Sequence, residues 1–133
     1  MEEKQVRYLE MIQSIVTRMA SNSFMLKGWS VTLTSALFAL AAKDANARYV
    51  YIAYFPAIMF WCLDGYFLYQ ERLFRKLYAY NVENPSLIKL FSMDTRSYEG
   101  GEASWACAII SKTLLIFHGV LIAVIAGVMV FLK

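Results

Sequence analysis

Three ionisable residues stand inside or at the edge of segments that are otherwise apolar: Lys27, Asp64 and His118, the last being the only histidine in the chain. A charged side chain within an apolar segment is costly unless it is paired or faces water, and such residues often mark ion or proton pathways. An ammonium and a carboxylate can form an ion pair, and an imidazole can carry a proton. Whether the three meet depends on the segments that carry them.

Three apolar segments approach or reach the roughly 20 residues that an α-helix needs to cross a bilayer. They cover residues 24–42, 49–69 and 108–132, and the chain is 59 % hydrophobic, compared with roughly 45–50 % in soluble domains. We therefore expect an all-α, helical integral membrane protein with three transmembrane helices. Residues 1–133 then form a single membrane domain.

The flanking segments are also predicted to be helical in part. Residues 2–22 place apolar side chains at helical spacing, which predicts an amphipathic helix that lies on the membrane surface or packs in a cytosolic collar of neighbouring subunits. No breaker follows the second span before Asn81, so its helix should extend into the cytosol. Residues 70–107 would therefore hold a cytosolic helix and a loop.

The distribution of charge predicts the orientation. The amino-terminal sequence has no apolar core followed by a cleavage site, so we expect that terminus to stay cytosolic. Ten of the 13 Lys and Arg residues then fall on or near the inner side, which agrees with the positive-inside rule. A net charge of +3 is too small to indicate a nucleic-acid surface.

The first two spans predict an ion pair. In an antiparallel hairpin with its turn centred between Ala45 and Asn46, Lys27 and Asp64 lie at the same depth. Pairing would offset the cost of a charge within a membrane. The alternative is that Lys27 extends to the interface while Asp64 caps a kink with Gly65.

His118 admits three interpretations. It is a neutral ring hydrogen-bonded across a helix interface, a residue that lines or gates a water-filled path, or a proton-relay group. Because it adjoins a row of small residues, we expect it near a contact between helices rather than facing lipid. That row predicts close helix packing, as does a weaker one in the first span. The six residues are Gly119, Ala123 and Gly127, with Gly28, Thr32 and Ala36.

Charged residues between the second and third spans are candidates for contact with a cytosolic protein partner, and the alternative is a solvated turn. They are Arg72, Arg75, Lys76, Asp94 and Arg96. No GxSxG, glycine-rich phosphate loop, HExxH or Cys and His cluster occurs, so we predict no catalytic residues, no cofactor and no metal site. The two cysteines, Cys62 and Cys107, fall in or beside apolar segments, which favours buried thiols.

Four segments together resemble a family of small bacterial membrane proteins grouped with the RipA family of octameric membrane proteins. They are MIQSIVTRMASNSFMLKGWSVTLTSALFALAAKD, FWCLDGYFLYQERLFRKLY, FSMDT and SKTLLIFHGVL. More distantly, a two-span hairpin with a cytosolic helix on each side is similar to SLATT-type effectors of bacterial conflict systems, although the third span departs from them. The resemblance implies a bacterial inner membrane, a homo-oligomer and, from the distant relatives, a pore used in defence.

Two functions follow as hypotheses. The first is a homo-oligomeric, pore-forming or channel-like assembly that permeabilises the membrane in a defence or stress response, in contact with membrane lipids and without nucleic acid. In it, His118 lines or gates the path and the small residues pack helices. The alternative is a membrane scaffold that conducts nothing and docks a cytosolic partner through residues 70–107.

Overall fold

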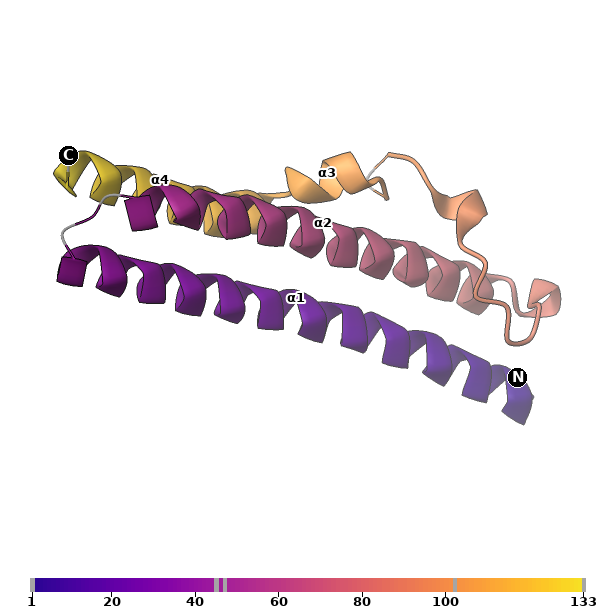
Figure 1. Ribbon diagram of the computed structural model, residues 1–133. Helices are drawn as coiled ribbons and strands as arrows, with labels where there is room; N and C mark the ends of the chain where they lie inside the picture. The colour runs from indigo at the N-terminus through magenta and orange to yellow at the C-terminus, as the bar shows by residue number, and fades with distance from the viewer. Residues whose placement is uncertain (1, 45, 47, 102, 133) are drawn as a thin grey trace.

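A computed structural model describes residues 2–44, 46, 48–101 and 103–132, and these residues form a long helical hairpin with a third helix beside it (Figure 1). Helices α1 (Glu3–Asp44) and α2 (Arg48–Glu83) run antiparallel along most of their lengths. We call the end where they are joined the turn end and the other the open end. Ala45, predicted at the turn centre, lies outside the described residues.

Helix α1 is one unbroken element of 42 residues that runs through both the predicted helix over 2–22 and the predicted span over 24–42. The segment contains no proline, and Gly28 is its only glycine. The polar run before Phe24 does not interrupt a helix whose backbone hydrogen bonds continue through it. At about 1.5 Å per residue the helix is about 63 Å long, roughly twice the thickness of a bilayer's hydrocarbon core.

Helix α2 continues beyond the second apolar segment, which confirms the predicted extension. Its 36 residues include Pro56, which lies within the apolar half and does not end the helix. The helix stops at Glu83, and Asn84 with the following Pro85 then leads into a short 3-10 helix over Pro85–Leu87. A second 3-10 turn covers Arg96–Tyr98. We call residues 84–101 the connecting segment.

The third apolar segment begins later than predicted. A five-residue helix, α3 (Trp105–Ile109), precedes a break at Ile110 and Ser111, and α4 (Lys112–Leu132) follows. Ser104 caps α3 by accepting a hydrogen bond from the Cys107 amide at 3.2 Å. The span predicted over 108–132 is therefore shortened at its start. α1, α2 and α4 are the helices long and apolar enough to cross a membrane in the described part of the chain, consistent with a multi-pass membrane protein.

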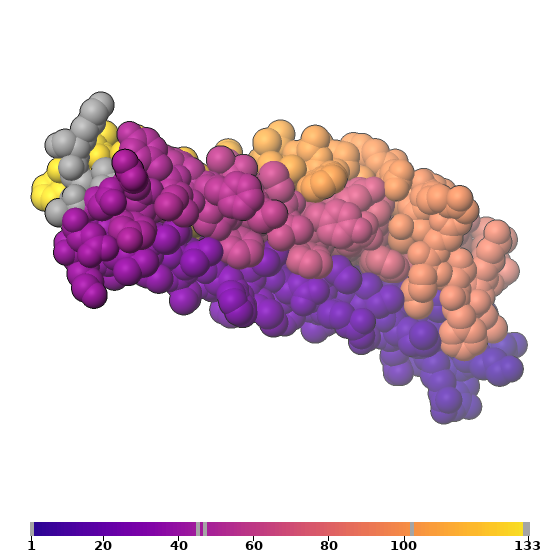
Figure 2. Space-filling model, viewed as in Figure 1, coloured from indigo at the N-terminus to yellow at the C-terminus, as the bar shows by residue number. Residues whose placement is uncertain are grey.

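Two apolar cores hold the helices together. At the turn end, small residues of α2 allow α1 and α4 to pack on it, in a cluster formed by Ala41, Val50, Ala53, Ala57 and Ile125. At the open end, Tyr8, Leu9 and Ile12 of α1 pack on Leu77 of α2. The amino-terminal part of α1 therefore buries its apolar face within its own chain, which neither of the two predicted placements anticipated. Figure 2 shows α1 along one flank of an elongated molecule, with the connecting segment against the open end.

Candidate functional site

The predicted ion pair is formed. The Lys27 ammonium on α1 lies 2.6 Å from Asp64 Oδ2 on α2, and the carboxylate side chain is fully buried. Lys27 keeps 17 % of its side chain exposed. Its ammonium is therefore turned toward the carboxylate, so the alternative in which Lys27 extends away and Asp64 only caps a kink does not describe the structure. Equal depth in an antiparallel hairpin was sufficient to locate this contact.

Two further residues complete the site. His118 Nε2 on α4 lies 2.7 Å from Asp64 Oδ2, and the imidazole is only 1 % exposed. Ser23 donates its hydroxyl proton to Asp64 Oδ1 and accepts a hydrogen bond of 2.8 Å from Lys27 Nζ. Asp64 is thus the common acceptor for α1 and α4. We call Ser23, Lys27, Asp64 and His118 the Asp64 cluster.

The hydrogen bonds favour one tautomer of His118. An ionised carboxylate only accepts hydrogen bonds, so Nε2 carries the proton that it donates to Asp64. His118 Nδ1 is buried with no hydrogen-bond partner among the described residues. A bare Nδ1 lone pair in that position costs less than an unsatisfied N–H group would. The arrangement therefore joins the imidazole and the Lys27 ammonium through one shared carboxylate oxygen, Asp64 Oδ2.

Aromatic rings enclose the imidazole. Trp61 stacks on it with the ring centroids 5.7 Å apart and an interplanar angle of 9°, while Phe117 meets it edge-on at 5.0 Å. Lys27 Nζ also lies 5.8 Å from the centroid of Phe117, within the range of a cation–π interaction. The Trp61 indole is itself fixed, because its Nε1 donates to the Ile109 carbonyl at 2.9 Å. The cluster is therefore held rigidly and shielded by apolar rings on these sides.

One side of the cluster borders open space. A cavity of about 240 Å³ is lined by Ser23 and Lys27 together with Glu71 and Thr113. Asp64 and His118 lie behind these residues and do not line it. The His118 ring is enclosed by side chains of its own chain, and its role in lining or gating a path stays a prediction. Its position between helices was predicted correctly.

The small-residue rows have no packing partner within the described part of the chain, so their role in close helix packing stays a prediction. A Cβ built on Gly28, Gly119 or Gly127 would have no neighbouring atom within 4 Å. Thr32, Ala36 and Ala123 are likewise exposed. The glycine that does allow close packing is Gly65, where a Cβ would lie 2.5 Å from Ile109 Cγ1 and 3.3 Å from Ile109 Cα. Gly65 therefore allows α3 to sit directly on α2.

The five charged residues expected to contact a partner lie along α2 and the connecting segment, and most already have partners in the chain. Arg96 forms an ion pair of 2.9 Å with Asp94, and Arg75 lies 3.7 Å from Glu71. Lys76 Nζ donates to the Tyr98 carbonyl at 3.5 Å. Arg72 is half-buried and also takes part in an interaction. The Arg96 guanidinium lowers the pKa of Asp94 from 3.8 to about 2, and Asp94 in turn raises the pKa of Arg96.

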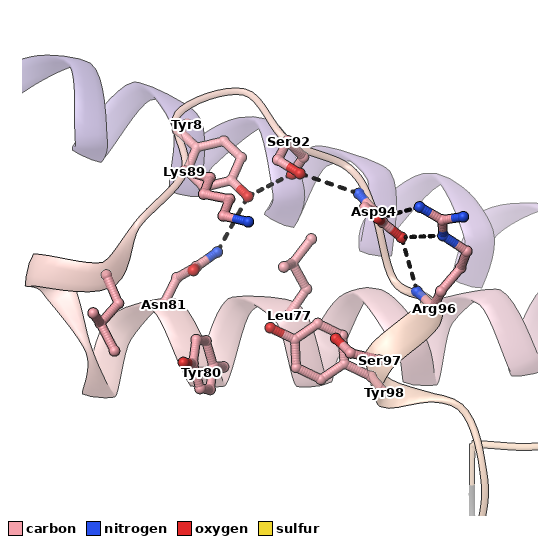
Figure 3. A pocket seen from close by; sticks show the side chains of 11 residues that line it. Tyr8, Leu77, Tyr80, Asn81, Lys89, Ser92, Asp94, Arg96, Ser97 and Tyr98 are labelled. Carbon is pink, nitrogen blue, oxygen red and sulfur yellow. Dashed lines mark hydrogen bonds and ion pairs between the residues drawn. The ribbon is translucent and has the colours of Figure 1, made fainter.

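A second cavity, of about 660 Å³, opens at the open end between α1, α2 and the connecting segment (Figure 3). Asp94 and Arg96 lie at its edge, and Tyr8 of α1 and Asn81 of α2 form part of its wall. No pattern in the sequence indicates this cavity, because it depends on how the connecting segment folds back on the hairpin.

The thiols differ from their predicted environment. Cys62 and Cys107 are both free and exposed on the protomer rather than buried, because they lie on the outward faces of α2 and α3. No group of three or more His, Cys, Asp or Glu side chains that could hold a metal ion occurs among the described residues.

Comparison with known proteins adds no relative. No family model, curated protein or solved structure matches this chain. The resemblance to the RipA family and to SLATT-type effectors therefore stays a prediction from the sequence.

Proposed function

We propose that the protein is a homo-oligomeric, multi-pass protein of a bacterial inner membrane whose subunits form a pore or channel-like assembly. The observation that carries the oligomer is the pair of small-residue rows, on α1 and α4, which face outward with nothing packed on them. Rows of this kind allow helices to approach closely within a membrane. A second copy of the chain, presenting a matching row, is the occupant we propose.

The orientation we propose places the open end in the cytosol. Residues 24–42 of α1 are about 28 Å long as a helix, which matches the roughly 30 Å hydrocarbon core. The preceding part of α1 then projects about 30 Å from the membrane, packed on the extension of α2. The Lys and Arg residues of the open end and connecting segment fall on this side, as the positive-inside rule requires.

The Asp64 cluster has a structural part in this proposal. By joining α1, α2 and α4 near the cytosolic boundary, it makes each protomer a rigid wedge, so the conducting path would lie between protomers. His118 would affect gating because its hydrogen bond to Asp64 ties α4 to α2, and not because it lines the path. Opening in a defence or stress response would then require movement of α4 relative to α2.

The experiment is native mass spectrometry of the protein from nanodiscs, followed by ion flux from liposomes. We expect wild-type oligomers, and we expect Gly119→Leu with Gly127→Leu to shift the distribution toward monomers. Val120→Leu, on an exposed position beside the row, is the matched control and should leave it unchanged. A monomeric wild-type protein, or an oligomer indifferent to both glycine changes, would overturn the proposed interface.

A scaffold is the second candidate, favoured by the exposed Asp94 and Arg96 pair on the connecting segment. A scaffold would conduct no ions and would dock a cytosolic protein through residues 70–107. This function does not depend on whether the protein is an oligomer. Liposome flux separates the two functions. An intact oligomer without flux, combined with a cytosolic protein whose binding is lost in Arg96→Ala, would favour the scaffold over the pore.

A further inference from the structure

The cavity at the open end is built from three separate parts of the chain. Tyr8 comes from the beginning of α1, Asn81 from the end of α2, and Lys89 and Tyr98 from the connecting segment (Figure 3). Its volume of about 660 Å³ lies within the roughly 300–1,000 Å³ typical of small-molecule sites. The Asp64 cluster has no part in it.

The lining of this cavity is polar, with a small excess of positive charge. Lys89 and Arg96 carry two positive charges against one negative charge on Asp94. Arg96 is engaged by Asp94, whereas the exposed Lys89 ammonium acts on Asp94 through its charge and has no side-chain hydrogen bond or ion pair among the described residues. Figure 3 shows the Lys89 side chain beside Tyr8, on the side of the cavity opposite Tyr80 and Tyr98. An exposed ammonium that lines a cavity, with no hydrogen bond of its own in the described part of the chain, is suited to pair with a phosphate or carboxylate.

Two tyrosines add an aromatic wall. The rings of Tyr80 and Tyr98 lie 5.9 Å apart at an angle of 59° on the side opposite Lys89. Burial, and to a lesser degree the neighbouring Tyr80, raise the pKa of Tyr98 above 10.0, so its hydroxyl stays neutral. Neutral phenol rings present faces on which a flat ring can stack. The wall and the ammonium together match a molecule with a flat ring at one end and a negative charge at the other.

The segment that closes the cavity is held in a strained conformation. Phe91 has a φ of 61°, in the left-handed region that residues with a side chain rarely occupy. Its ring packs edge-on against Tyr8, whose hydroxyl donates to the Ser92 carbonyl and accepts from Asn81 Nδ2 at 3.2 Å. Strain of this kind persists where surrounding contacts enforce it, and it is frequent at ligand clamps.

The location of the cavity indicates whether its anion would come from a lipid headgroup or from a soluble molecule. Tyr8 precedes Lys27 by 19 residues on the same helix, which places it about 28 Å beyond the Asp64 cluster. In the proposed orientation this is well outside the headgroup layer. A lipid phosphate cannot reach the cavity from that layer, so a soluble molecule is the source.

We infer that the cavity at the open end binds a soluble, anionic small molecule with a flat ring, its phosphate or carboxylate paired with Lys89 and its ring against Tyr80 and Tyr98. The inference goes beyond the proposed pore and requires neither the oligomer nor conduction, although the soluble source of the anion rests on the proposed orientation. It assigns Lys89, which sequence reasoning did not single out, as the main anion contact.

The test is isothermal titration of the full-length protein in nanodiscs with probes that separate charge from ring. Adenosine monophosphate carries both features, inorganic phosphate only the charge and adenosine only the ring, while benzoate is the carboxylate counterpart. We expect saturable binding of adenosine monophosphate or benzoate, at least about tenfold tighter than that of phosphate or adenosine alone. Vesicles containing phosphatidic acid should not compete with the bound probe.

Variants tie the binding to the cavity. Lys89→Ala should weaken binding of the ring-bearing anion about tenfold or more, because a charge-assisted contact is lost. Lys4→Ala is the matched control, since this exposed lysine of the same end does not line the cavity. Tyr98→Leu should remove the advantage of the ring-bearing probe over phosphate. Absence of saturable binding by both ring-bearing probes, equal binding in Lys89→Ala, or competition by the vesicles would overturn the inference.

Discussion

Replacing Asp64 tests the central contact of the structure. In Asp64→Asn, the fully buried side chain loses its charge and one of its two acceptor oxygens, while Lys27 and His118 keep their positions. Lys27 then carries an uncompensated charge with only 17 % of its side chain exposed. Three side-chain hydrogen bonds in a membrane amount to about 2 kcal/mol at the average of about 0.6 each. Removing one partner of a buried ion pair costs about 3–5 kcal/mol, so we expect a loss between about 2 and 5 kcal/mol.

A double-mutant cycle separates the pair from its surroundings. Lys27→Met leaves Asp64 with the Ser23 and His118 donors, so we expect a smaller loss of about 1–3 kcal/mol. Combining it with Asp64→Asn should cost less than the sum, with a coupling energy of at least about 1 kcal/mol. The exposed Lys112→Met at the start of α4 is the control and should be near neutral.

The assay is unfolding by SDS from mixed micelles, followed by circular dichroism, for the four members of the cycle and the control. Coupling below about 0.5 kcal/mol would refute the reasoning, because additive losses are those of residues that do not interact. A loss in Lys112→Met as large as that in Lys27→Met would also refute it, since any lysine would then have the same effect.

Three other changes have defined outcomes. Gly65→Ala should destabilise the protein by about 1–3 kcal/mol in the same assay, because the new methyl group overlaps α3, whereas Gly28→Ala should be neutral or slightly stabilising in the monomer. The low pKa of Asp94 means that its ion pair stabilises the connecting segment above pH 3.8 and that this contribution is lost as the pH falls through about 2. Hydrogen exchange in wild type and Asp94→Asn should therefore differ at neutral pH and converge below pH 2. The exchange Lys27→Asp with Asp64→Lys restores an ion pair but places an ammonium beside His118. The stability lost in either single variant should therefore return only in part. Full recovery would argue against the contact between residue 64 and His118.

The sequence was sufficient for the features that depend on depth and periodicity. Apolar length located the three long helices, and equal distance from the turn paired Lys27 with Asp64. Ser23 was within reach of the same reasoning, because it lies four residues before Lys27 on the same helix face. Ser23 lies between the predicted helix over 2–22 and the predicted span over 24–42, so neither segment included it.

The remaining features depend on contacts between distant segments. The approach of α4 to Asp64 is set by α3, which packs on Gly65 and is fixed by the Trp61 indole. No local pattern encodes that docking, so the third member of the Asp64 cluster was predicted only as a histidine near a helix contact. The rows of small residues are visible in the sequence, but the helix that packs on them is not, and nothing in the described part of one chain lies against their glycines.

The ion pair also bears on how the chain would enter a membrane during synthesis. A lysine or an aspartate within a lone transmembrane helix raises its insertion free energy by as much as about 2.5–3.5 kcal/mol. Because α1 and α2 are joined by a short turn, they can leave the translocon together with Lys27 and Asp64 already neutralising each other. The later α4 would then insert and dock on the finished hairpin. Biogenesis would thus proceed in two stages, and a ribosome stalled before α4 would already hold a hairpin without a net buried charge.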